Sequence, residues 1–145
     1  MPYRVLFLCT GNSARSQMAE ALLLLIGGHD FQAESAGTYP VGLNPVTVEA
    51  LREVGVDWQG RQSKRASEFM GQSFDYVITV CDRAKESCPV FPGPHKLLHW
   101  SFDDPAAALP EHRLKEFRRI RDQIADRLRT FLIDDLKLEP ASLHS

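Results

Sequence analysis

The spacing of hydrophobic residues along this chain predicts an alternation of strands and helices. Short runs rich in aromatic and β-branched residues predict four strands, at residues 3–8, 31–34, 75–80 and 96–100. Apolar residues at every third or fourth position predict helices, at residues 16–26, 45–54, 65–70 and 110–133. Strands separated by helices favour an α/β fold, and we expect a three-layer sandwich with a four-stranded parallel sheet.

Polar signals mark the ends of these helices. Gly27 and Gly28 follow the first helix, and Asn44 with Pro45 supplies a cap and a first-turn proline for the second. The apolar stripe of the long final helix consists of Phe117, Ile120, Ile124, Leu128 and Phe131. Acidic and basic side chains alternate on its other faces, which is typical of a solvated surface. Few large apolar side chains follow, so we expect residues 134–145 to form a loosely ordered tail.

Composition restricts the function further. The chain has 145 residues, of which 43% are hydrophobic, enough for one domain spanning residues 1–145 with its own core. Seventeen basic and nineteen acidic side chains give a net charge of −2, which argues against nucleic-acid and membrane-surface partners. The longest apolar run, residues 21–26, is too short to span a bilayer, and no signal-peptide pattern is visible. We therefore expect a cytoplasmic monomer.

The first of three cysteines, Cys9, lies between the first predicted strand and the first predicted helix. Free backbone N–H groups and the helix dipole at such a turn can bind an oxyanion. The expected binding loop consists of Thr10, Gly11, Asn12, Ser13, Ala14, Arg15 and Ser16. Arg15 adds a planar fork of donors, and the same field favours the thiolate of Cys9, so we interpret Cys9 as a nucleophile rather than a buried structural thiol. Ser16 has two interpretations of equal weight: a hydroxyl donor to Cys9, or a cap of the helix.

The second cysteine, Cys81, directly follows the third predicted strand. Because parallel strands end at the same edge of a sheet, we expect Cys9 and Cys81 to emerge together, at a spacing compatible with a disulfide if their strands are neighbours. Cys88 lies seven residues further on, about 10 Å away along a helix axis, so pairing it with Cys81 requires the segment to unwind. Two unrelated buried thiols are the alternative. Residues 82–87 are all small or polar, however, which suits a mobile surface segment.

A zinc site is a rival interpretation of this region, and its ligands would be Cys81, Cys88, His95 and His99. Six residues separate the two cysteines, whereas about two to four residues usually separate paired cysteine ligands in structural zinc sites. His99 also falls within a predicted strand. We therefore predict no metal and no cofactor, and keep a non-enzymatic thiol or zinc sensor as a remote alternative.

Two strings of residues carry a resemblance to known enzymes. Cys9, five further residues, Arg15 and Ser16 resemble the phosphate loop of low-molecular-weight protein tyrosine phosphatases and of the thioredoxin-coupled arsenate reductases that share their fold. The longer string over residues 9–20 is more similar to the reductases, since the phosphatases usually carry proline where this chain has Gln17. Residues 80–106, with both later cysteines, also resemble the reductases. The implied fold is a four-stranded parallel sheet with the phosphate loop after the first strand.

The resemblance implies a mechanism with three thiols. Cys9 would attack arsenate, for which phosphate and sulfate are competing oxyanions, and Asp104 would act as the proton donor. Cys81 and then Cys88 would form successive disulfides, and thioredoxin would reduce the last one; a glutaredoxin is the alternative reductant. From the residues alone, Asp104 before Pro105 is also a common helix cap.

Three departures from the family pattern affect the expected site. Some reductases bind potassium through four residues, and Asn12, Glu20 and Ser35 match three of them; Lys64 stands at the fourth position, and we expect its ammonium group to take the place of the ion. Ala14 replaces a cysteine found in many relatives. Ala106 replaces the tyrosine that usually follows Asp-Pro in the phosphatases.

A phosphatase-like phosphomonoesterase, which needs only Cys9, Arg15, Asp104 and the loop, is the alternative enzyme.

Overall fold

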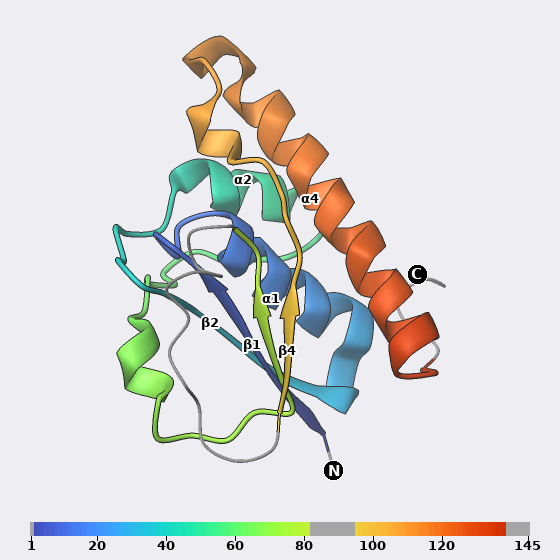
Figure 1. The fold of residues 1–145 in the computed structure, drawn as a ribbon. Helices are drawn as coiled ribbons and strands as arrows, with labels where there is room; N and C mark the ends of the chain where they lie inside the picture. The colour runs from blue at the N-terminus through green and yellow to red at the C-terminus, as the bar shows by residue number, and fades with distance from the viewer. Residues whose placement is uncertain (1, 82–94, 139–145) are drawn as a thin grey trace.

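A parallel four-stranded sheet forms the centre of the molecule, in a computed structural model that describes residues 2–81 and 95–138 (Figure 1). The strand order is β2-β1-β3-β4, and all three neighbouring pairs are parallel. The strands are β1 (Tyr3–Cys9), β2 (Phe31–Gly37), β3 (Tyr76–Thr79) and β4 (Lys96–His99). The α-helices of the described residues are α1 (Arg15–Gly27), α2 (Pro45–Arg52) and α4 (Arg113–Thr130). The α/β fold class predicted from the sequence is confirmed.

Three helices lie on the same side of the sheet. Helix α1 contacts β1 and β2, and α4 contacts both α1 and α2; in Figure 1, α1 lies behind the strands and α4 runs beside it to the right. Aromatic rings join this layer to the strands: the ring of Trp100 lies 6.2 Å from that of Phe7 and 5.5 Å from that of Phe131. All members of the predicted apolar stripe are buried, namely Phe117, Ile120, Ile124, Leu128 and Phe131. Burial of that stripe explains why the long helix forms where the spacing predicts it.

The opposite face of the sheet is covered by a shorter element. Arg4, Leu6 and Leu8 alternate with residues of the first face, and both leucines are fully buried. The guanidinium of Arg4 lies 4.6 Å from the centre of the Phe74 ring, which in turn contacts Phe69. Phe69 ends the 3₁₀-helix η2 (Ala66–Phe69), where a short helix over residues 65–70 is predicted.

Several element boundaries differ from the predicted ones. Strand β2 continues to Gly37, three residues further than predicted, because residues 35–37 stay paired with residues 7–9 of β1. The final helix begins with a 3₁₀ turn, η4 (Pro110–His112), and ends in a π-helical turn, η5 (Phe131–Asp135). Residues 134–138, predicted to belong to a loose tail, are held by backbone bonds such as the one from the Leu138 N–H to the Leu132 carbonyl oxygen at 2.8 Å.

Gly37 packs where no side chain fits. A Cβ atom at this position would lie 2.5 Å from the Thr10 carbonyl oxygen and 3.0 Å from the Asn12 nitrogen, both backbone atoms of the loop after β1. We predict that Gly37→Ala lowers the free energy of unfolding by about 1–3 kcal/mol, because backbone atoms must move to admit the methyl group. Urea denaturation followed by far-UV circular dichroism measures the change.

Gly71→Ala is the matched control, because an added Cβ at Gly71 meets no atom within 4 Å. We expect its unfolding free energy to stay within about 0.5 kcal/mol of the original. Equal losses in the two variants would show that the contact between Gly37 and the loop does not limit stability.

Candidate active site

The loop that joins β1 to α1 forms one wall of a pocket. Cys9 is the last residue of β1 and Arg15 the first of α1, so residues 10–14 make the turn between them. The pocket has a volume of about 340 Å³ and is lined by Cys9, Thr10, Gly11, Ser13, Ala14, Arg15, Val41, Asp104 and Ala106. The structure thus brings the first cysteine, the arginine and the aspartate of the predicted site to one place.

The Cys9 sulfur atom receives two hydrogen bonds from the loop. The backbone N–H of Asn12 donates to Cys9 Sγ at 3.2 Å, and Ser16 Oγ lies 2.9 Å from the same sulfur. Ser16 Oγ already accepts a bond from Asn12 Nδ2 at 2.8 Å, so its own hydroxyl proton is available for the sulfur. Helix α1 begins one residue before Ser16, and its N-cap, Ala14, makes no side-chain cap bond. Of the two interpretations of Ser16, the geometry favours the hydroxyl donor.

Asn12 is the residue on which these contacts converge. It is fully buried and has a φ of 49°, in the left-handed region that few residues other than glycine adopt. Its side chain uses every hydrogen-bonding position: Nδ2 donates to Ser16 Oγ and to Ser35 Oγ at 3.0 Å. Its Oδ1 accepts from Gln17 Nε2 at 3.1 Å and from the Lys64 backbone N–H at 2.8 Å. These bonds hold the backbone N–H of Asn12 toward Cys9.

Arg15 and Asp104 face each other across the pocket. The Arg15 guanidinium donates to the Phe102 carbonyl oxygen at 3.0 Å, and its other terminal nitrogen lies 4.0 Å from Asp104 Oδ2. Asp104 is also the N-cap of the 3₁₀-helix η3 (Pro105–Ala107), because its Oδ1 accepts from the Ala106 N–H at 3.0 Å. One carboxylate oxygen therefore fixes the side chain while the other points toward Arg15. The cap and a role in the pocket are compatible.

Cys81 emerges at the same edge of the sheet as Cys9, as predicted. Strand β3 is the neighbour of β1, and the Val80 N–H donates to the Leu8 carbonyl oxygen at 2.8 Å. Cys81 follows Val80, is 4% exposed, and has its sulfur 3.5 Å from the hydroxyl oxygen of Thr10. Both Cys9 and Cys81 are free thiols. Cys88 and the predicted rearrangement of its segment lie outside the described residues.

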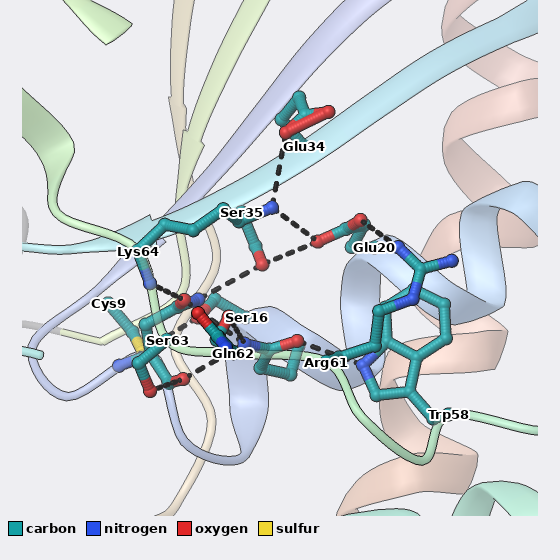
Figure 2. A network of polar contacts seen from close by, with 12 residues as sticks. Cys9, Ser16, Glu20, Glu34, Ser35, Trp58, Arg61, Gln62, Ser63 and Lys64 are labelled. Carbon is teal, nitrogen blue, oxygen red and sulfur yellow. Dashed lines mark hydrogen bonds and ion pairs between the residues drawn. The ribbon is translucent and has the colours of Figure 1, made fainter. Parts of the chain in front are cut away.

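The residues compared with a potassium site form a polar network beside the loop (Figure 2). Glu20 is 2% exposed, and burial raises the pKa of its carboxyl group. Its Oε1 accepts from Ser35 Oγ at 2.6 Å and from Lys64 Nζ at 3.5 Å, and a guanidinium nitrogen of Arg61 lies 3.9 Å from its Oε2. Asn12 turns its amide nitrogen, not its oxygen, toward Ser35. Two side-chain cations, those of Lys64 and Arg61, therefore contact this carboxylate in the structure.

Sequence reasoning did not predict three residues of this region. Val41 lines the pocket from an irregular loop in which no hydrophobic period is visible. Gln17 and Trp58 form a buried pair that reaches Asn12 from the side opposite Ser35. The one sequence signal for this pair is that Gln17 stands where the phosphatases usually carry proline.

Metal-binding and membrane-spanning features were also sought in residues 2–81 and 95–138. Within these residues, no three histidine, cysteine or acidic side chains come together as metal ligands. His99 Nδ1 lies 2.7 Å from the Thr79 hydroxyl oxygen, and Cys88 of the zinc hypothesis is not described. No helix in the same ranges has both the length and the apolar character needed to cross a bilayer.

Comparisons with known proteins agree with this geometry. An arsenate reductase of Bacillus subtilis (strain 168) is 42% identical over 129 residues, which cover 88% of this chain and 93% of that protein. The solved structure of an arsenate reductase in its oxidised state matches with a TM-score of 0.76 and 28% identity, over 88% of this chain and 94% of the other. The thioredoxin-dependent arsenate reductase of Corynebacterium glutamicum matches with a TM-score of 0.66 and 30% identity, over 88% of this chain and 59% of the other.

A family model covers nearly the whole chain. Residues 4–142 match the family described as low molecular weight phosphotyrosine protein phosphatase. The match includes the loop after β1, Arg15 and Asp104, which the structure places around one pocket. This chain belongs to the low molecular weight phosphotyrosine protein phosphatase family.

Proposed function

We propose that this protein reduces arsenate to arsenite and is recycled by thioredoxin. The observation that carries the proposal is the second thiol: the Cys81 sulfur lies 3.5 Å from the hydroxyl oxygen of Thr10, a residue that lines the pocket next to Cys9. A phosphatase needs one nucleophile in such a pocket, whereas reduction needs further thiols to supply electrons. The reductase relatives, one of them thioredoxin-dependent, support the same choice.

The first step takes place in the pocket. The Cys9 thiolate attacks the arsenic atom, a sulfur–arsenic bond forms, and an arsenic–oxygen bond breaks. Asp104, at the opposite wall, donates a proton so that the oxygen leaves as water or hydroxide. The Arg15 guanidinium and the loop N–H groups hold the remaining oxygens, because Arg15 and most residues of the loop line the pocket.

The next two steps transfer electrons between thiols. The Cys81 thiolate attacks the Cys9 sulfur, the Cys9–Cys81 disulfide forms, and the electron pair of the broken sulfur–arsenic bond stays on arsenic, which leaves as arsenite. The Cys88 thiolate then attacks Cys81 and releases Cys9 as a thiolate. The dithiol of thioredoxin reduces the Cys81–Cys88 disulfide and is itself oxidised. The role of Cys88 rests on the sequence resemblance.

This chemistry explains why arsenate is a substrate for reduction and phosphate is not. Phosphate and arsenate are both tetrahedral oxyanions, so both fit a pocket built from N–H donors and a guanidinium. Thiols do not reduce phosphorus, so phosphate stops at the first step and acts as a competitor. Cys81 contributes only where the oxyanion is reducible.

We predict that Cys81→Ser abolishes arsenate turnover coupled to thioredoxin, because the thiol that releases arsenite is lost. The measurement is NADPH consumption with thioredoxin and thioredoxin reductase, repeated with a glutaredoxin system to identify the reductant. Hydrolysis of p-nitrophenyl phosphate by the same variant is the control for an intact pocket. Normal arsenate turnover by Cys81→Ser would falsify the three-thiol scheme.

The second candidate function is hydrolysis of phosphate monoesters, which the pocket formed by Cys9, Arg15 and Asp104 also permits. We predict that Cys88→Ser ends arsenate turnover but retains p-nitrophenyl phosphate hydrolysis, because hydrolysis needs no disulfide exchange. Cys9→Ser should end both activities. Loss of both activities in Cys88→Ser would contradict this division of roles.

The proton donor can be tested with two neighbouring aspartates. We predict that Asp104→Asn lowers kcat for p-nitrophenyl phosphate by about 100-fold or more, because the amide still accepts the Ala106 N–H but cannot protonate a leaving group. Asp103→Asn is the matched control, since the Asp103 side chain is 81% exposed and contacts Arg119 on the surface. Equal kcat values for the two variants would exclude Asp104 as the acid.

A further inference from the structure

The Gln17 side chain is fully engaged in hydrogen bonds beside the loop. Gln17 lies in the first turn of α1 and is 1% exposed. Its Nε2 donates at 3.1 Å to the Asn12 carbonyl oxygen, at 3.1 Å to Asn12 Oδ1 and at 3.1 Å to the Gln62 carbonyl oxygen. Its Oε1 accepts from the indole Nε1–H of Trp58 at 2.9 Å. One amide thus connects the loop to residues 58–62.

Trp58 determines which end of this amide faces the loop. The indole nitrogen is a donor only, so it selects the oxygen end of Gln17 and directs the NH₂ end toward the two oxygens of Asn12. A reversed amide would place oxygen against oxygen at Asn12 and N–H against N–H at Trp58. Trp58 is 3% exposed, and the Arg61 guanidinium carbon lies 4.1 Å from the centre of its ring, where it holds the indole in place (Figure 2).

The same contacts reach the nucleophile through Asn12. Gln17 holds both the carbonyl oxygen and the side-chain oxygen of Asn12, and these two bonds fix the residue in its left-handed conformation. In that conformation the Asn12 N–H donates to Cys9 Sγ and its Nδ2 donates to Ser16 Oγ. A proline at position 17, as in the phosphatases that the sequence resembles, could make none of these bonds.

We propose that Gln17 and Trp58 are positioning residues that maintain the Cys9 thiolate by holding Asn12. The indole orients the glutamine, the glutamine orients the asparagine, and the asparagine directs its N–H and the Ser16 hydroxyl at the sulfur. The proposal rests on the proposed function only in taking Cys9 as the nucleophile; it does not depend on arsenic chemistry.

The test measures the reactivity of the Cys9 thiolate directly. Iodoacetamide alkylates thiolates and not thiols, and trypsin separates the three cysteines into peptides 5–15, 66–83 and 86–96, so mass spectrometry follows Cys9 alone. The variants are Gln17→Met, which keeps the length of the side chain, and Trp58→Phe, which keeps a ring for Arg61. Trp100→Phe is the matched control, because Trp100 Nε1 has no hydrogen-bond partner among the described residues.

We expect alkylation of Cys9 near pH 6 to slow by about three- to tenfold in Gln17→Met and in Trp58→Phe, because hydrogen bonds to the charged sulfur weaken. Near pH 10, above the ordinary thiol pKa of about 8.5, the rates should equal that of the unmodified protein. Trp100→Phe should match the unmodified protein at both pH values.

Two results would overturn the proposal: unchanged rates at both pH values, or an equal slowing at both, which indicates altered access rather than a changed thiolate. If Gln17→Met does not fold, as judged by circular dichroism, Trp58→Phe decides alone. Absence of arsenate turnover in the unmodified protein would contradict the proposed function and leave this result intact.

Discussion

The site depends on one buried residue held in an unfavourable backbone conformation. Asn12 has a φ of 49° and no exposed surface, and a left-handed conformation costs an L-residue about 1–2 kcal/mol. Its side chain is bonded at all four positions to groups from α1, β2 and the segment that ends at Lys64, so the fold determines the conformation. In this conformation the backbone N–H of Asn12 donates to Cys9 Sγ. Gly37 belongs to the same constraint, because a side chain there would collide with the loop backbone.

The parallel sheet explains how a second thiol reaches this pocket. Strands β1 and β3 are neighbours and run in the same direction, so the residues that follow them emerge side by side. Cys9 ends β1, and Cys81 comes two residues after the end of β3, with the Thr10 hydroxyl between the two loops. A single residue at a neighbouring strand end therefore places a second thiol beside the loop that follows β1. No rearrangement of the sheet is required.

Elements with a regular hydrophobic period could be predicted from the sequence, and contacts between irregular segments could not. The stripe that includes Phe117 and Phe131 predicts α4, and the apolar runs before Cys9 and Cys81 predict β1 and β3, which places both cysteines at one edge. The loop itself follows from a cysteine and an arginine at a strand-to-helix turn. Residues 58–64 have no period, and the bonds of Trp58 to Gln17 and of the Lys64 backbone N–H to Asn12 depend on how the chain returns past β2. Tertiary structure alone creates those contacts.

The direction of the hydrogen bonds in the network orients the donors that face Cys9. The Asn12 amide has two N–H donors: one points to Ser16, whose hydroxyl is directed at Cys9, and the other to Ser35, whose hydroxyl donates to Glu20. An acceptor at each end, the Cys9 sulfur and the Glu20 carboxyl group, keeps both chains of donors pointing outward from the amide. Lys64 and Arg61 lie against Glu20, and their positive charges lower the pKa of its carboxyl group in opposition to burial, which raises it. The direction of the hydrogen bonds at Cys9 is thus linked through Asn12 and Ser35 to Glu20, and an apolar residue at position 20 would leave the second chain without the acceptor that orients it.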